Sequence, residues 1–324
     1  MRVALAGLGG AAIHGHLPAV HQLSGEGRLH LVAAADPAPA PRRTLACRFP
    51  GVPTFTCAEE MLRGVEADVL IVATEPTAHV ELVELALAHD LHVVCEKPLV
   101  HVKDHLAAVR AAARPSPNLA IVSVHQYRHA VAWRRVSAVA RSLHMLRIPF
   151  SLLAEVHRHG TEDPYAASPW RGDLKSSGGL LADHGAHFVA LASTIDRDMN
   201  VLGAGRSWRG PGLESSWGKV QFGSGTLELR LSTLADRRRT LLRLGAPGLA
   251  LAWESARVDL RLASRRVRSW GAGELSDRRY LDSLYLGFYD ELARRLDDPF
   301  WRAARTAESL RVCEVLIEML RRAA

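Results

Sequence analysis

The sequence predicts an α/β protein, with an N-terminal doubly wound parallel sheet and a C-terminal α+β domain that has an open, mainly antiparallel sheet. Three observations support this prediction. Short apolar runs alternate with helical patterns up to about residue 124, strand-length runs follow one another directly between about 200 and 270, and two helical patterns end the chain. Strands that alternate with helices form parallel sheets, and strands in direct succession form antiparallel ones.

The length of 324 residues fits two domains. We place them at 1–124 and 125–324, because the pattern of elements changes between these spans. The terminal helices lie within the second span, and packing of these helices against the first domain is the alternative.

Five apolar runs of strand length define the first domain, at 2–6, 29–35, 68–73, 91–95 and 119–124. Helical patterns follow the first and third of them, at about 12–23 and 78–89. Strands that are apolar throughout are buried on both faces, as in a parallel sheet covered by crossover helices. The right-handed crossover rule then gives a doubly wound sheet.

The second domain has a different pattern. We expect a helix at about 130–143, a strand at 150–157, a polar loop at 160–177 and an apolar helix at 178–195. Strand-length runs at 219–222, 226–232, 239–244 and 257–262 predict the antiparallel sheet. Helical patterns at about 281–296 and 303–322 end the chain.

Composition excludes several classes of protein. Apolar residues make up 48% and charged residues 23%, which is ordinary globular usage and not that of a disordered or fibrous chain. No run of 18 apolar residues predicts a membrane span, and the first residues lack the features of a signal peptide. Four scattered cysteines indicate buried thiols in a reducing compartment. We therefore expect a cytoplasmic protein.

The net charge of +7 is unevenly placed. Between residues 206 and 279 there are 15 cationic and 7 anionic residues, so the excess lies in the predicted antiparallel sheet. Only 4 of the 41 cationic residues are lysines, a bias typical of a GC-rich genome, and we expect a bacterial source. No nucleic-acid-binding module is recognisable. The charge indicates a solvated or subunit-facing sheet surface, with an anionic substrate as the lesser alternative.

A glycine turn follows the first apolar run. In GLGGAA, Gly7 permits a tight turn, Gly9 lets the backbone approach a pyrophosphate, and Ala12 allows close packing of helix on sheet. The following helix N-terminus favours an anion. The spacing predicts dinucleotide binding, and the alternative is a purely structural turn.

Asp36 ends the second apolar run. An acid at this place hydrogen-bonds the ribose hydroxyls of NAD and repels the 2′-phosphate of NADP. We therefore favour NAD, although Arg42 and Arg43 follow closely and leave NADP possible. The alternative is that Asp36 only caps a helix.

A charged pair, Glu96 and Lys97, ends the fourth apolar run of the first domain and precedes Pro98. The carboxyl ends of parallel strands are where α/β sheets bind ligands. The alternative is a surface turn with a salt-bridged lysine. Because lysine is rare in this chain, a functional lysine at this position is the better interpretation.

Residues 178–188 read GGLLADHGAHF. On one helix, Asp183 and His187 are four residues apart and share a face, which suits general acid–base chemistry. The alternatives are a helix-terminal carboxylate and a core histidine. A metal site including His184 is disfavoured, because no second histidine stands four residues from the first and no further ligand cluster is evident.

These three motifs, in this order, resemble those of the glucose–fructose oxidoreductase / inositol dehydrogenase / MocA (Gfo/Idh/MocA) family. The likeness is strongest over about 1–195 and architectural after about 200. In DVLIVATEPTAHVELVELALAHDLHVVCEKPL, Thr74, Pro76 and His79 match the loop that borders the nicotinamide. HQYRHAVAWRRV at 125–136 is similar to the segment entering the second domain, and GGLLADHGAH to the family's Asp/His helix.

The resemblance implies a Rossmann domain, a C-terminal domain whose sheet often forms an oligomer interface, and an active site between them. It implies Lys97, Asp183 and His187 as the catalytic residues. His187 would exchange the hydroxyl proton, Lys97 would stabilise the same oxygen as an anion, and Asp183 would bind a neighbouring hydroxyl. Cofactor contacts would include the turn residues, Asp36, Thr74, Pro76, His79, Glu96 and Lys97.

The chain departs from the family pattern in three places: His16 stands one residue later than usual, Ala12 replaces the third glycine, and His184 is an unusual neighbour within the Asp/His motif. Substrate contacts are expected from the entry segment, from the loop at 157–175 and from the Asp/His helix. The candidates are Tyr127, Arg128, His157, Tyr165, Trp170, Arg171 and His184. Arg171 ranks first, because guanidinium suits a carboxylate or phosphate.

The resemblance favours hydride transfer between NAD(P) and a carbinol or carbonyl carbon of a sugar, cyclitol or sugar-like intermediate. Three alternatives stay open: an NAD-assisted glycoside hydrolase or lyase, an imine or enone reductase of secondary metabolism, and a dinucleotide-sensing regulator. We expect a small polyhydroxylated substrate, a homodimer or homotetramer formed through the C-terminal sheet, and no metal, nucleic acid or membrane partner.

Overall fold

The computed structural model describes residues 1–159, 169–210 and 213–324. Its contacts divide the chain into two compact units. The first comprises residues 1–124 and 282–310, and the second residues 125–281 and 311–324. The first unit therefore includes a segment from near the end of the chain.

The first unit contains a parallel sheet of six strands in the order β3-β2-β1-β4-β5-β6. The strands are β1 (Arg2–Ala6), β2 (His30–Ala35), β3 (Thr54–Phe55), β4 (Val69–Val72), β5 (His92–Cys95) and β6 (Ile121–Ser123). The order reverses at β1, as in a doubly wound fold. The parallel sheet predicted from the alternation of strands and helices is therefore confirmed, and β3 is a two-residue edge strand that the hydrophobic pattern does not reveal.

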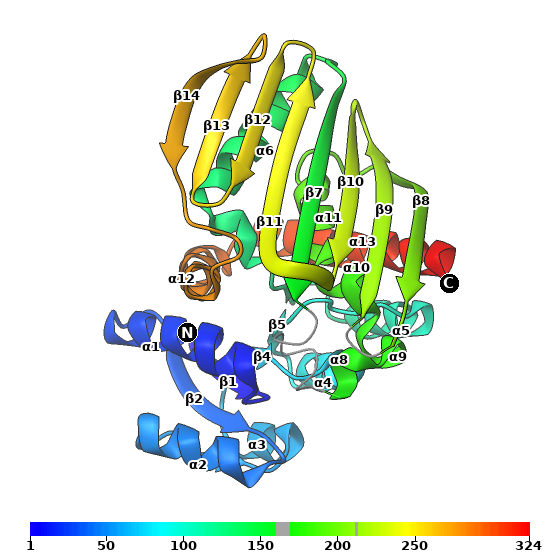
Figure 1. Cartoon of the computed structure of the whole chain (residues 1–324). Helices are drawn as coiled ribbons and strands as arrows, with labels where there is room; N and C mark the ends of the chain where they lie inside the picture. Colours follow the sequence, from blue (N-terminus) through cyan, green and yellow to red (C-terminus); the bar gives the residue numbers. More distant parts are fainter. Residues whose placement is uncertain (160–168, 211–212) are drawn as a thin grey trace. The chain divides into compact units, whose positions relative to one another are not determined.

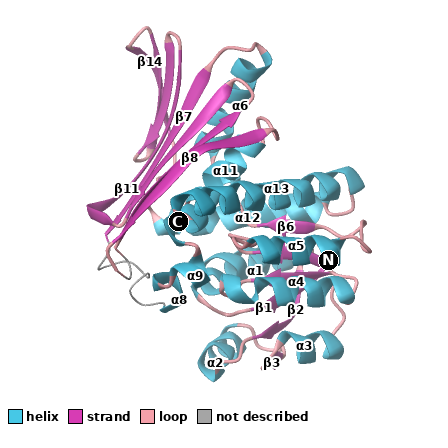
Figure 2. Ribbon diagram, turned by 90° about the vertical axis from the view of Figure 1, so that its right-hand side faces the viewer, coloured by secondary structure: helices cyan, strands magenta, loops and turns pink. Residues whose placement is uncertain are grey.

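Helices cover both faces of this sheet (Figure 2). They are α1 (Leu17–Gly25), α2 (Pro39–Arg48), α3 (Ala58–Gly64), α4 (His79–Ala88), α5 (Lys103–Ala113) and the greater part of α12 (Arg278–Arg295). The main core lies where α1 and α12 pack on one face. Leu5, Leu23, Tyr289 and Leu292 are all buried there.

A π-helical turn at Ala12–His16 precedes α1. Such turns accommodate one extra residue and occur frequently at functional sites. This turn is the structural counterpart of the late position of His16 in the sequence. A Cβ on Gly15 would lie 2.6 Å from the ring of Tyr285 on α12, so only glycine lets the two elements approach this closely.

The second unit contains a sheet of eight strands in the order β14-β13-β12-β11-β7-β10-β9-β8. The strands are β7 (Phe150–His159), β8 (Met199–Trp208), β9 (Glu214–Phe222), β10 (Gly225–Ser232), β11 (Leu234–Ala246), β12 (Leu249–Glu254), β13 (Arg257–Leu262) and β14 (Arg265–Gly271). Every pairing is antiparallel except that of β7 with β10. The predicted open, mainly antiparallel sheet is confirmed.

Helices cover only one face of this second sheet (Figures 1 and 2). They include α6 (Val131–Met145), α10 (Gly179–Asp183), α11 (Gly185–Ser193) and the end of α13 (Pro299–Ala323), with the short α8 (Pro169–Gly172) and α9 (Leu174–Ser177) before them. The contact of α13 with the sheet is close, because a Cβ on Gly218 of β9 would meet Met319. Alternate residues on β7 to β11 therefore point either to these helices or to the open face.

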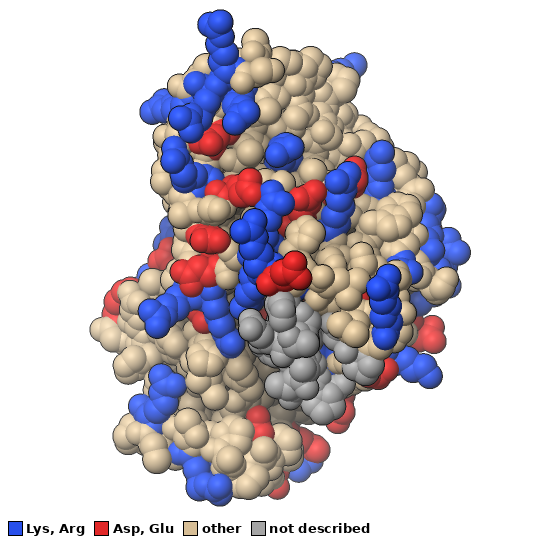
Figure 3. All heavy atoms as spheres, viewed as in Figure 1, with Lys and Arg blue, Asp and Glu red and all other residues tan. Residues whose placement is uncertain are grey.

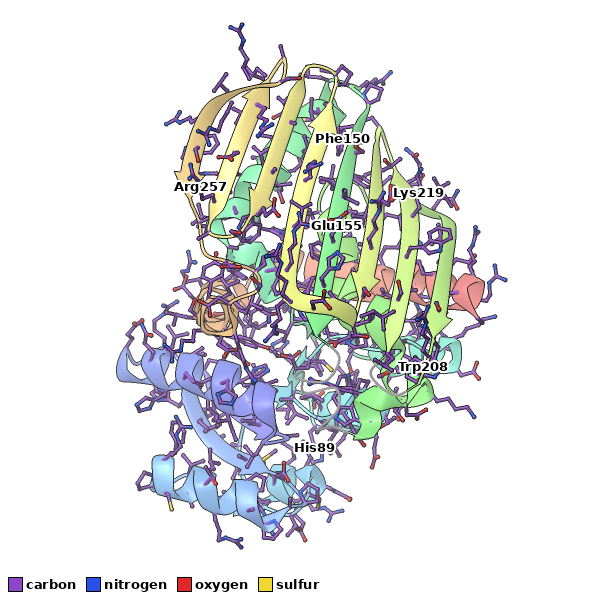
Figure 4. All side chains as sticks on the ribbon, in the orientation of Figure 1. His89, Phe150, Glu155, Trp208, Lys219 and Arg257 are labelled. Carbon is purple, nitrogen blue, oxygen red and sulfur yellow. The ribbon has the colours of Figure 1, made fainter. Side chains whose placement is uncertain are left out.

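The open face of the second sheet carries much of the positive charge (Figure 3). Arg230 pairs with Glu228 and Glu155, and Arg239 pairs with Glu254 and Glu155. Glu155 and Lys219 are labelled on this face in Figure 4. The charge excess found in the sequence between 206 and 279 therefore belongs largely to one sheet and is partly neutralised there.

In the described part of the chain, no helix is both long and apolar enough to cross a membrane.

We expect Gly15→Ala to destabilise the protein by about 1–3 kcal/mol, because the new Cβ overpacks the ring of Tyr285. Gly25→Ala, at the end of α1, is the matched control. No atom lies within 4 Å of its Cβ position, so alanine should stabilise by about 0.4–1 kcal/mol through the unfolded chain. Urea denaturation of both variants measures this, and equal midpoints would contradict the packing argument.

Candidate functional site

The glycine turn after β1 has the shape that a pyrophosphate requires. Gly7 has a φ of +90°, and its Cβ would lie 2.7 Å from the backbone of Ala73, so the turn excludes any side chain. Gly9 is exposed and has open space around its Cβ position. Ala12 is fully buried against the sheet. The turn thus presents accessible backbone at the start of a helix, which fits a dinucleotide phosphate.

Asp36 lies beside this turn, directly after β2. The backbone N–H of Leu8 donates to its Oδ2 and that of Ala38 to its Oδ1, each at 2.8 Å. The carboxylate is half-buried and held in place by the turn itself. Its position after the second strand is where a ribose-binding acid stands in dinucleotide-binding folds.

The carboxylate of Glu96, at the end of β5, is the centre of a buried hydrogen-bond network. Tyr285 donates its hydroxyl hydrogen to Glu96 Oε1 at 2.5 Å, and His16 Nε2 lies 3.0 Å from the same oxygen. The Tyr289 hydroxyl lies 2.5 Å from His16 Nδ1. The side chains of His16, Tyr285 and Tyr289 are all buried. The network joins the π-helical turn, β5 and α12 within the first unit.

The network keeps Glu96 ionised. Burial alone raises the pKa of this carboxyl, but the hydrogen bond and charge of His16, the charge of Lys97 and the hydrogen bond from Tyr285 outweigh burial and lower it to about 2. Burial and the charge of Glu96 raise the pKa of Tyr285 well above its usual value, so its hydroxyl stays a donor.

Lys97 follows Glu96 at the carboxyl end of β5, and its backbone N–H donates to Glu96 Oε2 at 3.1 Å. The Lys97–Pro98 peptide is cis. The lysine side chain is half-buried. Glu96 therefore ties the backbone of Lys97 to the network through its second oxygen.

His79 braces the loops beside Lys97. Its Nδ1 lies 3.0 Å from the carbonyl oxygen of Pro98, and its Nε2 lies 3.2 Å from that of Thr74. Burial lowers the pKa of this imidazole. Because its side chain is fully buried, its contribution to the loop that includes Pro76 is structural. Thr74 itself is half-buried.

In the second unit, a buried ion pair fixes the start of the Asp/His segment. Glu214 Oε2 accepts a hydrogen bond from Leu180 N–H at 2.9 Å, and its Oε1 lies 3.2 Å from Arg206 Nε. Arg206 also donates to the carbonyl of Gly178 at 2.9 Å. Gly179 has a φ of +70°, and its Cβ would lie 2.6 Å from Glu214 Oε2. The carboxylate of Glu214 thus leaves no room for a side chain at Gly179.

The Asp/His segment is two helices and not the single helix expected at 178–195. α10 ends at Asp183, His184 separates the two, and α11 begins at Gly185. His184 Nε2 lies 3.9 Å from Asp183 Oδ2, and both side chains are half-buried. The apolar pattern of residues 178–195 favours a continuous helix. The break lies beside Gly185, whose Cβ position is 3.2 Å from Leu229 Cδ1 and 3.8 Å from Leu231 Cδ1.

His187 lies in an aromatic cluster. Its ring stacks on Tyr127 with centroids 3.9 Å apart and planes inclined by 14°, and His125 meets it edge-on at 5.7 Å. All three side chains are buried. The entry segment at 125–136 thus contacts the Asp/His segment directly, and the imidazole of His187 has a fixed plane.

The remaining substrate candidates lie at different places. Arg171 lies over the ring of Trp170 on α8, at 4.8 Å, and both are half-buried. His157 is on β7, where it lines a hollow on the open face with Trp217 and Arg230. The sheet therefore separates His157 from α10 and α11. Arg128 is half-buried beside Tyr127, and Tyr165 lies outside the described residues.

No group of three or more metal-ligating side chains occurs among the residues that the structure describes. The residues that follow the strands at the carboxyl edge of the first sheet are of the types expected for a dinucleotide site. Gly7 follows β1, Asp36 follows β2, Thr74 follows β4 and Lys97 follows β5.

Comparison with known proteins agrees with a dinucleotide site at this edge of the first sheet. The sequence model of the Gfo/Idh/MocA oxidoreductase family, described as an NAD-binding Rossmann fold, matches residues 1–129. Residues 1–129 therefore form an NAD(P)-binding Rossmann domain of the Gfo/Idh/MocA oxidoreductase type. The family resemblance and the NAD(P) cofactor predicted from the motifs are therefore confirmed. No curated protein sequence matches the chain.

Solved structures share the fold of the whole chain. A dehydrogenase from Chromobacterium violaceum is 20% identical, with a TM-score of 0.81 over 100% of this chain and 95% of that one. The WlbA dehydrogenase from Bordetella pertussis, in complex with NADH and UDP-GlcNAcA, is 18% identical, with a TM-score of 0.79 over 99% and 95%. KijD10, a 3-ketoreductase from Actinomadura kijaniata in complex with NADP and TDP-benzene, is 17% identical, with a TM-score of 0.79 over 100% and 98%.

Sequence reasoning did not single out the residues that support the site. Tyr285 and Tyr289 lie about 190 residues after Glu96 and belong to a helix that reads as ordinarily amphipathic. The sequence marks His16 only by its late position in the glycine-turn helix and gives no signal for His125. Glu96 is the one sign of this hydrogen-bond network in the sequence, because a carboxylate at the end of a buried strand needs hydrogen-bond donors.

We expect Tyr285→Phe to cost about 1.5–3 kcal/mol at pH 7, because it removes a hydrogen bond to a buried carboxylate. The pKa of Glu96 is depressed in the folded protein, so its stabilisation is present above about pH 4.5 and is lost as the pH falls toward about 2. In the variant, Glu96 binds its proton at a higher pH than in the unmodified protein. The difference in unfolding free energy between the two proteins should therefore shrink as the pH falls from about 4.5 toward about 2.

Urea denaturation at several pH values measures this loss. Tyr289→Phe is the control, because its hydroxyl touches His16 and not Glu96, and its cost should depend less on pH. A loss for Tyr285→Phe that is unchanged from pH 7 to pH 3 would show that the tyrosine does not hold the ionised carboxylate.

Proposed function

We propose that the protein is an NAD(P)-dependent dehydrogenase or reductase acting on a carbinol or carbonyl carbon of a sugar, cyclitol or sugar-like intermediate. The observation that carries this proposal is the carboxyl edge of the first sheet. There the pyrophosphate-sized turn at Gly7, the ribose-type carboxylate of Asp36 and the lysine held by Glu96 follow strands of one parallel sheet. Adjacent strands of that edge thus supply both cofactor-binding and oxygen-binding groups.

The bound nicotinamide would supply the hydride acceptor or donor. The ammonium of Lys97 would donate a hydrogen bond to the substrate oxygen and favour its anionic form. His187 would take the hydroxyl proton in oxidation and return it in reduction, with its ring plane held by Tyr127. Asp183 would bind a neighbouring hydroxyl.

NAD is the favoured cofactor. Asp36 is fixed by two backbone N–H groups beside the glycine turn, where its charge would repel a 2′-phosphate. Arg43 is exposed and Arg42 half-buried on α2, which leaves binding of NADP possible.

Further substrate contacts are proposed for Tyr127, Arg128, Trp170, Arg171 and His184. His157, which the sequence also offers, lies on the open face of the sheet, away from the Asp/His segment. The WlbA and KijD10 structures contain UDP-GlcNAcA and TDP-benzene, respectively. Their likeness in fold supports a sugar-related substrate.

We also propose that the open face of the second sheet joins copies of the chain in a cytoplasmic homodimer or homotetramer. Trp217 on β9 belongs to this face, since it pairs with Arg230 in the register, and 49% of its surface is exposed. Large apolar side chains on a helix-free sheet are typical of an interface.

We expect Lys97→Met to lower turnover by about a hundredfold or more, because the substrate oxygen loses its charged donor. The affinity for NADH should change little. Lys103→Met, on the exposed start of α5, is the matched control and should turn over as the unmodified protein does.

The measurement is NADH absorbance across sugars, cyclitols and nucleotide sugars, with NADH binding followed separately by fluorescence. Full turnover by Lys97→Met would refute the proposed role. Permanently bound NAD with no net reduction would favour the NAD-assisted hydrolase or lyase.

We expect Asp36→Ser to shift the cofactor preference toward NADP, because the variant keeps a small polar group but loses the charge that repels a 2′-phosphate. Titration with NADH and NADPH measures the ratio of dissociation constants. An unchanged ratio would place cofactor discrimination elsewhere, with Arg42 as the next residue to replace.

A further inference from the structure

Arg158, near the end of β7, is a buried cation that has only neutral partners. Its residue surface is 2% exposed. Its Nη1 donates to the carbonyl oxygen of His157 at 3.1 Å and to Thr240 Oγ1 at 3.2 Å. Within the described residues, no carboxylate forms an ion pair with this guanidinium.

A buried guanidinium without a counter-charge is costly. Arginine cannot lose its proton, and desolvation of an unpaired ion costs several kcal/mol, on the order of what a whole domain gains by folding. The same unit contains the usual solution, since Arg206 has a half-buried guanidinium that pairs with the buried carboxylate of Glu214. Arg158 lacks such a partner, and this absence requires an explanation.

Arg158 points to the side of the sheet that carries the Asp/His segment. Val156 and Arg158 are buried, whereas Glu155 and His157 are less so, as alternation along a strand requires. Glu155, labelled on the open face in Figure 4, belongs to the other set. Arg158 thus faces the layer of α10 and α11, opposite to its neighbour His157.

The register places Arg158 next to the start of α11. Val156 pairs with Leu231 on β10, and a Cβ on Gly185 would lie 3.8 Å from Leu231 Cδ1. Arg158 is the next residue of the same face, about 7 Å further along β7. It therefore lies near the junction between α10 and α11, where Asp183 and His184 are found.

We propose that Arg158 binds an anionic group of the substrate, a carboxylate or a phosphate, with the hydroxyl of Thr240 as a second donor. This inference rests on the proposed function for the place of the substrate. A planar guanidinium has five N–H donors and binds either oxyanion through two parallel hydrogen bonds. The substrate class is thereby narrowed from polyhydroxylated compounds in general to sugar acids, sugar phosphates or nucleotide sugars.

The test compares D-glucose with three anionic relatives, D-glucuronate, glucose 1-phosphate and UDP-glucose. Each is titrated into the full-length protein saturated with NADH, and binding is measured by calorimetry. We expect the unmodified protein to bind at least one anionic sugar roughly tenfold to a hundredfold more tightly than glucose. The affinity for glucuronate compared with that for glucose 1-phosphate distinguishes a carboxylate site from a phosphate site.

Arg158→Met should abolish this preference while leaving NADH affinity unchanged, because methionine fills similar apolar volume without charge. Arg158→Gln keeps the capacity to hydrogen-bond Thr240 and should also lose the preference, which covers the case in which the methionine variant does not fold. Arg239→Met is the control, since Arg239 lies on the open face and pairs with Glu254; the preference should remain.

Two results would overturn the proposal: an unmodified protein that binds no anionic sugar more tightly than glucose, or a folded Arg158 variant that keeps the preference. The binding arm is independent of turnover. Loss of anion binding in Arg158→Met, in a protein that oxidises no NADH with any carbonyl compound, would support the anion site and refute the proposed function. NADH-dependent reduction of neutral sugars only, with no preference for anionic sugars, would support the proposed function and refute the anion site.

Discussion

The buried, ionised carboxylate of Glu96 is the constraint on which the first unit depends. An ion in a protein interior is tolerated only when hydrogen bonds replace its hydration. His16 and Tyr285 supply these bonds, so the π-helical turn and α12 must both reach the end of β5. This requirement explains why Gly15 has no room for a side chain and why a helix from near residue 290 completes a domain that begins at residue 1.

In the second unit, too, a buried carboxylate has hydrogen-bond and charge partners, and here they position the Asp/His segment. Glu214 and Arg206 form a buried pair that also binds the backbone of the double glycine, so the Asp/His segment begins at a defined point. The stacking of His187 on Tyr127 then fixes the imidazole plane. Among the described residues, Arg158 is a buried cation with no carboxylate partner, and a bound anion would supply its counter-charge.

Strand alternation gives the second sheet two chemically different faces. The helix-covered face holds the aromatic cluster and Arg158, whereas the open face holds paired surface charges such as Arg230 with Glu228. His157 and Arg158 are neighbours in sequence but lie on opposite faces. The sequence offers His157 as a substrate contact and gives no sign of Arg158, because the two faces of β7 are told apart only once the strand is seen to continue to residue 159.

The sequence by itself determined the parallel sheet, the antiparallel sheet and the motifs of the carboxyl edge, because hydrophobic period and glycine turns are local properties of the chain. It offered Lys97 as a candidate through its place at a strand end, and Asp183 and His187 through their spacing on a helical pattern. Only the tertiary structure decided the partners of Glu96, the break at His184 and the burial of Arg158. These depend on which distant segments pack together, and a tyrosine on an amphipathic helix carries no local sign that a carboxylate 189 residues earlier needs its hydroxyl.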